Sequence, residues 1–398
     1  MRQTVPLLFL CVLISLTRVG AIHHMKRHIE ERQSSGGSIP LMVTNMCNDT
    51  IYPGINTQAG QGPQSQGFEL QSGANNTQYV SENWQGRVWG RTNCSFNSQG
   101  TGPSGNGYQA CNTGDCNGVV NCSVTGNTPV TLAEFTLNGG DGQTYYDISL
   151  VDGYNLPMAI VLLPLSNAFF QAIPPNLTNP SCIGTVGDFN PSQSYSPYSD
   201  GQQATFLGTN SSSPLPFANN ISYSDVANWC PWDLQVSPPK GPGDGVYPYP
   251  DSTIQRPIFN PCLSACAKYN SDSDCCNGKY NSPNSCSPNY YSTAAKSVCP
   301  DAYSFAYDDQ TSTFIIPAGA GFAVVFCPGE RSTDILATSK QQLSRLAGTG
   351  SGAASSSSSG GMIRSLASST LAERDGRTWC WAVFTALAVV AWSFVAGC

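Results

Sequence analysis

The amino-acid sequence predicts a mainly β protein that is exported from the cell and stabilised by disulfide bonds. Glycine (39) and proline (28) are abundant among the 398 residues and helix formers are scarce, which is typical of short strands joined by turns. Fourteen of the seventeen cysteines fall between Cys47 and Cys327, an even number that suits an oxidising compartment. The clearest strands are predicted around 131–137 and 145–151, where apolar and polar residues alternate.

The N-terminal region is predicted to be a secretory leader. In residues 1–21, Arg2 precedes an apolar run and a small-residue cleavage site, and the run is too short to span a membrane. Residues 22–40 are polar and lack periodicity, so we expect a disordered or pro segment. They contain all three histidines of the chain.

The absence of histidine beyond residue 40 limits the chemistry of the body. It excludes Ser-His-Asp and Cys-His catalysis and removes the commonest zinc ligands, so any acid–base chemistry has to use carboxylates. We therefore expect no metal and no cofactor. The formal net charge of −7 argues against nucleic acid as a partner and is compatible with an uncharged polysaccharide.

The body begins with a predicted edge strand, LMVTNMC, which starts at Leu41. In the segment GRVWGR, alternation places Arg87, Trp89 and Arg91 on one face of a strand. Arg87 is either a salt-bridge partner in a cluster of carboxylates or an exposed arginine beside a tryptophan.

Two predicted strands carry carboxylates on their polar faces. In TLAEFTL, alternation separates Glu134 from the apolar residues Ala133 and Phe135. A turn rich in glycine and asparagine follows, and YYDISLV is the returning strand, which Asp152-Gly153 ends. Asp147 points to one face of that strand. The pattern predicts carboxylates gathered along one surface of a sheet.

The chain resembles the thaumatin-like proteins. The stretch GYQACNTGDCNGVVNC follows the family signature, and WGRTNC, TLAEFTLN, YDISLVDGYNLPM and CPDAYSFAYDDQTSTF match further family segments in the same order. The resemblance covers 41–328 and implies an antiparallel β-sandwich with a disulfide-rich loop domain and a small disulfide-bound lobe. It implies a sandwich at about 41–93, 126–170 and 296–328, a small lobe at about 94–125, and a loop domain at about 171–295.

The resemblance also implies an acidic cleft between the sandwich and the loop domain. Its lining residues correspond to one arginine and four acids of this chain: Arg87, Glu134, Asp147, Asp152 and Asp309. Arg91 and Asp308 are the neighbouring candidates if the register is shifted.

The same resemblance implies a disulfide pattern. The expected pairs are Cys47–Cys327, Cys94–Cys111, Cys116–Cys122, Cys182–Cys299, Cys230–Cys262, Cys266–Cys275 and Cys276–Cys286. The family's eighth bond is not expected, since both of its cysteines are absent. Asn-x-Ser/Thr motifs predict glycans on Asn48, Asn75, Asn93, Asn121, Asn176, Asn210 and Asn220.

Two regions depart from the family pattern. The connection 183–229 is much longer than usual, and it is either a sugar-stacking wall beside the cleft or a glycosylated surface loop.

Residues 329–378 are predicted to be a Ser/Gly-rich linker and spacer. Residues 379–398 are apolar and end the chain, which indicates a GPI-anchor signal, with a transmembrane helix as the alternative.

Two functions fit these residues. The first is binding of β-1,3-glucan or another cell-wall polysaccharide without catalysis, by a monomer at the cell surface. The second is an endo-β-1,3-glucanase in which Glu134 is the general acid and Asp152 or Asp147 is the base or nucleophile. A third reading makes the acids a structural salt-bridge network around Arg87.

Overall fold

The computed structural model describes residues 38–348, except 106, 140, 193–195, 199–206 and 237–260. The predicted leader, most of the predicted linker and the apolar tail lie outside the described residues. No helix in the described part of the chain is long and apolar enough to cross a membrane.

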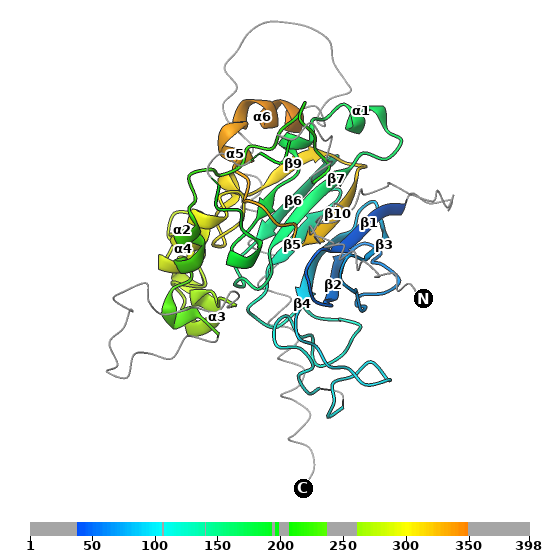
Figure 1. The fold of residues 1–398 in the computed structure, drawn as a ribbon, viewed down its shortest axis with the longest axis vertical. Coiled ribbons are helices and arrows are strands. Elements are labelled where there is room, and N and C mark those ends of the chain that lie inside the picture. The colour runs from blue at the N-terminus through cyan, green and yellow to red at the C-terminus, as the bar shows by residue number, and fades with distance from the viewer. Residues whose placement is uncertain are drawn as a thin grey trace, which may run out of the picture.

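Ten strands form two five-stranded sheets that pack face to face (Figure 1). The first sheet has the order β3-β1-β10-β7-β8. Its strands are β1 Ser38–Asn45, β3 Asn75–Ser81, β7 Met158–Leu163, β8 Ser181–Cys182 and β10 Gly321–Phe326. The second sheet has the order β2-β4-β5-β6-β9. Its strands are β2 Tyr52–Ala59, β4 Gln85–Arg91, β5 Leu132–Thr136, β6 Gln143–Ser149 and β9 Phe314–Pro317.

The prediction of an edge strand at Leu41 is wrong. Strand β1 lies inside the first sheet, between β3 and β10, and its pairing with β10 is parallel. All other named strand pairs are antiparallel. Strand β1 is central because β10, which lies near the C-terminal end of the body, pairs with the edge of β1 that β3 leaves open.

Aromatic side chains fill the space between the two sheets. Phe322 of β10 lies 5.2 Å from Phe135 of β5 and 4.9 Å from Tyr146 of β6, measured between ring centroids. Phe314 of β9 continues this group at 5.4 Å from Tyr146. Because Phe135 points into this core, alternation turns Glu134 to the outer face of the second sheet, as the sequence predicted.

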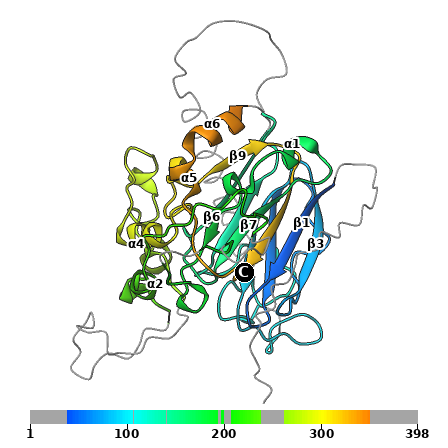
Figure 2. The same cartoon turned by 45° about the horizontal axis from the view of Figure 1, so that its top comes forward.

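The helices are short and lie mostly to one side of the sandwich. Figures 1 and 2 show α2, α3 and α4 grouped beside the sheets, with α5 and α6 at one end. Their bounds are α1 Ala168–Gln171, α2 Tyr223–Asn228, α3 Ala265–Tyr269, α4 Tyr290–Val298, α5 Ile335–Thr338 and α6 Lys340–Gly348. Side-chain caps begin four of them: Asn167 caps α1, Ser222 caps α2, Ser264 caps α3 and Asn289 caps α4.

Seven disulfide bonds staple these parts together, and they join the same seven pairs that the resemblance implied: Cys47–Cys327, Cys94–Cys111, Cys116–Cys122, Cys182–Cys299, Cys230–Cys262, Cys266–Cys275 and Cys276–Cys286. A disulfide bond typically adds about 2–4 kcal/mol to the free energy of unfolding, and thermodynamic models differ on whether the effect is entropic or enthalpic. The division into sandwich, small lobe and loop domain at the expected boundaries stays a prediction.

Residues 329–348 are not a linker, contrary to the predicted start of the spacer at residue 329. Arg331 and Thr333 are fully buried, Ile335 joins the main core, and helices α5 and α6 follow. Leu343 and Leu346 of α6 pack against that core. The folded body therefore reaches at least Gly348.

Candidate functional site

Three adjacent strands place three charged side chains in one row. In the register of the second sheet, Arg87 of β4 is opposite Glu134 of β5, and Glu134 is opposite Asp147 of β6. Arg87 Nη2 and Glu134 Oε1 form an ion pair at 3.0 Å, with 12% and 28% of the two side chains exposed. The row lies on the outer face of the second sheet, opposite the aromatic core.

Asp147 occupies the most unusual environment in the row. Burial raises the pKa of Asp147 well above its usual value, and the negative charges of Glu134 and Asp309 add to this rise while Arg87 opposes it. Its Oδ1 atom is buried and accepts no hydrogen bond from the described residues. The environment therefore favours a protonated carboxyl at this position.

Asp152 joins the row from the turn that follows β6. The turn bends sharply at Gly153, whose φ is 100°, and a Cβ there would lie 2.5 Å from the carbonyl oxygen of Cys262. Burial raises the pKa of Asp152, and Glu134 adds to the rise while Arg87 opposes it. Asp152 is thus close enough to share an electrostatic site with both residues.

Asp309 reaches the same site through a tyrosine. The hydroxyl of Tyr303 donates to Asp309 Oδ1 at 2.7 Å and also pairs with the hydroxyl of Thr313. Burial raises the pKa of Tyr303, with further contributions from Asp147 and Asp309. We call Arg87, Glu134, Asp147, Asp152 and Asp309 the acidic cluster.

The two neighbouring candidates have structural contacts instead. Arg91 is fully buried and donates to the carbonyl oxygens of Tyr52, Pro53, Val119 and Val120. Asp308 forms an ion pair with Lys296 at 3.0 Å and accepts hydrogen bonds from Ser304. Their side chains hold loops in place, so the geometry favours Arg87 and Asp309 as the site residues.

The cluster offers hydrogen-bond acceptors and one cation. No group of three or more His, Cys, Asp or Glu residues in the described ranges has the arrangement of a metal site. Carboxylates accept hydrogen bonds from hydroxyl groups, and the guanidinium group of Arg87 donates them. The arrangement therefore suits a ligand with many hydroxyl groups.

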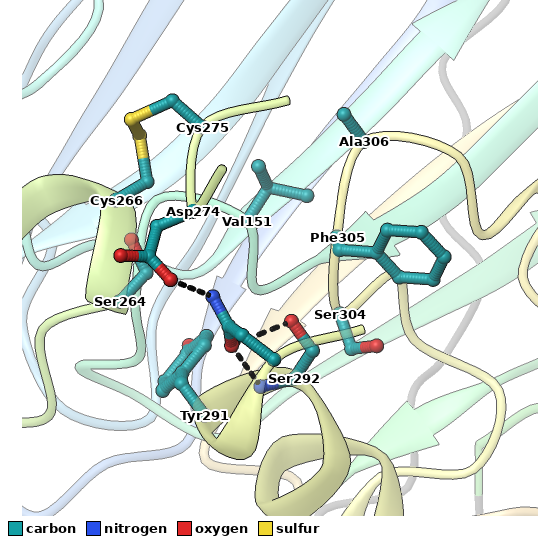
Figure 3. Close-up of a pocket in the computed structure, with 11 residues that line it drawn as sticks. Val151, Ser264, Cys266, Asp274, Cys275, Tyr291, Ser292, Ser304, Phe305 and Ala306 are labelled. Carbon is teal, nitrogen blue, oxygen red and sulfur yellow. Dashed lines mark hydrogen bonds between the residues drawn. A yellow bond between two sulfur atoms is a disulfide. The ribbon is translucent and has the colours of Figure 1, made fainter. Parts of the chain in front are cut away.

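A small pocket lies next to the cluster, between the helices and the loop 304–306. Val151, which precedes Asp152, lines it together with Tyr291 and Phe305. Figure 3 shows the Cys266–Cys275 bond on the side of the pocket away from Phe305. Its volume is about 30 Å³, enough for one or two water molecules. Among its lining residues, Asn289 Nδ2 donates to Asp274 Oδ1 at 2.9 Å. The pocket is too small to be a sugar site.

Comparison with known proteins decides the family. The model of the thaumatin family matches residues 45–328. The chain belongs to the thaumatin family.

The relatives of this family member include plant pathogenesis-related proteins. Pathogenesis-related protein 5 of Arabidopsis thaliana is 35% identical over 288 residues, which cover 72% of this chain and 89% of the relative. Pathogenesis-related thaumatin-like protein 3.5 of Cryptomeria japonica is 33% identical over 294 residues, covering 73% and 91%. The solved structure of the thaumatin-like xylanase inhibitor TLXI is 32% identical over 31% of this chain and 76% of its own. Its TM-score of 0.26 is too low to support an argument about function.

The described parts of the long insert of this thaumatin family member pack against the body in more than one place. Val161 of β7 pairs with Ala323, which alternates with the core residue Phe322 and so points away from the second sheet. A Cβ at Gly208 would lie 3.0 Å from Val161 Cγ1, so this part of the insert lies on the sheet face turned away from the acidic cluster. At the end of the insert, the ring centroid of Trp229 lies 6.2 Å from that of Tyr291 in α4. The sugar-stacking wall and the glycosylated surface loop both stay predictions.

Tyr303 is the site residue that sequence reasoning missed. It lies in CPDAYSFAYDD, one of the segments that carry the family resemblance, so the signal was present without a role attached. The predicted glycan acceptors Asn48, Asn75, Asn93, Asn121, Asn210 and Asn220 are exposed, whereas Asn176 is half-buried with its Oδ1 atom buried.

Proposed function

We propose that this thaumatin family member binds β-1,3-glucan, a neutral cell-wall polysaccharide, at the acidic cluster. The observation that carries the proposal is the paired row Arg87–Glu134–Asp147 on the outer face of the second sheet. Asp152 and Asp309 extend the row by their electrostatic contact with it. A salt-bridge network with only a structural role would not need three acids in addition to the one that pairs with Arg87.

A neutral glucan suits this chemistry. Its hydroxyl groups donate to the carboxylates of Glu134 and Asp309, while Arg87 donates to sugar oxygens. The net charge of −7 disfavours acidic polymers and leaves neutral ones unaffected.

Co-sedimentation with insoluble β-1,3-glucan tests the binding proposal. The full chain with Glu134→Gln should bind at least about tenfold more weakly than wild type, because the amide loses the ion pair with Arg87 and a charged acceptor. Glu82→Gln is the matched control, since Glu82 is an exposed carboxylate outside the cluster. Unchanged binding by Glu134→Gln, or no binding by the wild type, would contradict the proposal.

Hydrolysis is the second candidate function, and the different environments of two paired carboxyls favour it. Glu134 is ion-paired with Arg87 at 3.0 Å, whereas burial raises the pKa of Asp147. Within this alternative, Asp147 is better suited to donate a proton, and Glu134 to act as base or nucleophile. These roles reverse the ones expected from the sequence, in which Glu134 was the acid.

Reducing-sugar release from soluble β-1,3-glucan tests this alternative. If Asp147 is the acid, Asp147→Asn should slow cleavage of the polymer far more than cleavage of an aryl glucoside, whose leaving group needs no proton. Glu134→Gln should slow both substrates. No sugar release by the wild type, with binding retained, would leave a non-catalytic glucan-binding protein.

We also propose that the protein acts outside the cell. The predicted leader 1–21 and the apolar segment 379–398 support entry into the secretory pathway and attachment to the cell surface by a GPI anchor.

A further inference from the structure

A single carboxylate gathers two tyrosines on the helical side of the molecule. Asp233 lies in a short 3-10 helix, Trp232–Leu234. Its Oδ2 atom accepts hydrogen bonds from Tyr269 Oη at 2.6 Å and from Tyr290 Oη at 2.7 Å. Tyr269 ends α3 and Tyr290 begins α4, so three separate segments converge on one oxygen atom.

Both tyrosine rings remain exposed in spite of these bonds. The exposed fraction is 51% for Tyr269 and 47% for Tyr290. Two other exposed tyrosines, Tyr79 and Tyr108, make no hydroxyl hydrogen bond within the described chain. A hydroxyl group held by a hydrogen bond is therefore not a general feature of the exposed tyrosines of this protein. The bonds to Asp233 hold two large apolar faces at the surface with little rotational freedom to lose on binding.

The carboxylate at the centre is charged. Burial acts to raise the pKa of Asp233, but the hydrogen bonds from Tyr269 and Tyr290 outweigh this effect and lower it, with help from Lys268. A charged oxygen between two rings accepts hydrogen bonds from hydroxyl groups and repels anions.

We propose that Tyr269, Tyr290 and Asp233 form a second polysaccharide-binding surface, which we call the tyrosine surface. Its ligand is an uncharged polymer of pyranose sugars, because such rings present an apolar face for stacking and hydroxyl groups at the edge for Asp233. The choice of β-1,3-glucan as the first probe rests on the function proposed for the acidic cluster. The proposal of the tyrosine surface does not depend on that function.

Helix α4 connects the two surfaces. Tyr290 precedes Tyr291, whose hydroxyl donates to the carbonyl oxygen of Leu150 at 2.7 Å. Burial raises the pKa of Tyr291, and the negative charge of Asp152 adds to this rise. The helix that presents the tyrosine surface thus also contacts the strand end that carries part of the acidic cluster, and a long polymer gains from contacting both surfaces.

Paired variants of the full chain separate the aromatic faces from the hydroxyl bonds. Tyr269→Ser/Tyr290→Ser removes both, Tyr269→Phe/Tyr290→Phe keeps the faces, and Tyr79→Ser/Tyr108→Ser is the matched control. Co-sedimentation is measured on particles of β-1,3-glucan, cellulose and xylan, with thermal unfolding as the test of folding. If the serine pair fails to fold, a leucine pair, which keeps apolar bulk without an aromatic face, replaces it.

The serine pair should bind one of these polysaccharides about fivefold to tenfold more weakly. The phenylalanine pair should show a smaller loss, because it keeps the aromatic faces without the bonds that hold them, and the control should be unchanged. Equal binding by the serine pair and the wild type on every particle would overturn the proposal. An equal loss in the serine and phenylalanine pairs would also overturn it, because the aromatic faces would then contribute nothing beyond the hydroxyl groups. Weaker binding by Glu134→Gln together with unchanged binding by the serine pair would support the acidic cluster as a binding site and overturn the tyrosine surface.

Discussion

Asp147 links the site to the stability of the whole protein. Its pKa is raised by burial, so the folded protein holds this proton more tightly than the unfolded chain does. The contribution to stability is therefore fully present below about pH 4, the ordinary range of an aspartate, and is lost as the pH rises toward the raised pKa. Asp152 acts in the same direction.

Asp147→Asn should remove the loss of stability that accompanies rising pH, because the amide resembles the protonated acid at every pH. We expect the variant to be more stable than wild type by roughly 1–3 kcal/mol at pH 7 and equally stable near pH 3. Urea unfolding measured from pH 3 to pH 8 with the disulfides intact provides the comparison. A constant difference across that range would show that Asp147 does not titrate as its surroundings indicate, and Glu82→Gln should follow the wild type throughout.

Tyr303 acts as a positioning residue for the acidic cluster. Tyr303→Phe removes the hydroxyl that donates to Asp309 and pairs with Thr313, while the ring and the backbone bonds to β6 remain. We expect glucan binding to weaken about threefold to tenfold with little change in melting temperature. Tyr307→Phe is the control, since Tyr307 Oη donates to Asn281 on a neighbouring loop. Equal effects of the two substitutions would argue against a specific role for Tyr303.

Two buried arginines hold the irregular segments of the fold in the same way. Arg91 donates to four backbone carbonyl groups and lies 5.4 Å from the ring centroid of Phe96 in the small disulfide-bound region. Arg331 donates to the carbonyl groups of Asn190, Ser192, Ala218 and Ile221 and lies 4.8 Å from the ring of Phe189. Each guanidinium group satisfies four backbone carbonyl oxygens from two separate segments of the chain.

Replacing the second of these arginines should release the insert and leave the sheets folded. Arg331→Met leaves buried carbonyl groups unsatisfied, so we expect a loss of at least about 3 kcal/mol in the free energy of unfolding. Hydrogen exchange should speed up around 189–192 and 217–221 before it changes in β7 and β10. Arg345→Met provides the control, because Arg345 is exposed on α6. Faster exchange spread evenly over both sheets would mean that the insert is not a separate unit.

The sequence predicted elements that depend on local pattern and missed those that depend on distant pairing. The period of two around Glu134 and Asp147 was enough to place both carboxylates on the outer face. The pairing of Arg87 with Glu134 depends on how β4 meets β5 across the intervening lobe, which alternation alone does not define. For the same reason β1 was mistaken for an edge strand, because its partner β10 lies near the other end of the body.

Residues 329–348 were missed for a different reason. Their composition is mixed, and the strongest compositional signal nearby is the Ser/Gly-rich run that follows, so the whole stretch was assigned to a linker. What fixes them is tertiary: Asp301, itself buried, accepts hydrogen bonds from Thr333, Ile335 and Leu336 and so starts α5. A buried capping carboxylate from another segment has no signature in the local sequence.

At the scale of the whole molecule, the proposed anchor determines where both binding surfaces work. If 379–398 is a GPI signal, a phosphatidylinositol-specific phospholipase C should release the full chain from intact cells, whereas a spanning helix would resist the enzyme. Deleting residues 379–398 should send the protein into the medium with its glucan binding unchanged, because the residues of both proposed surfaces lie between 87 and 309. Retention of the full chain after phospholipase treatment, together with resistance to alkaline carbonate extraction, would replace the anchor with a transmembrane tail.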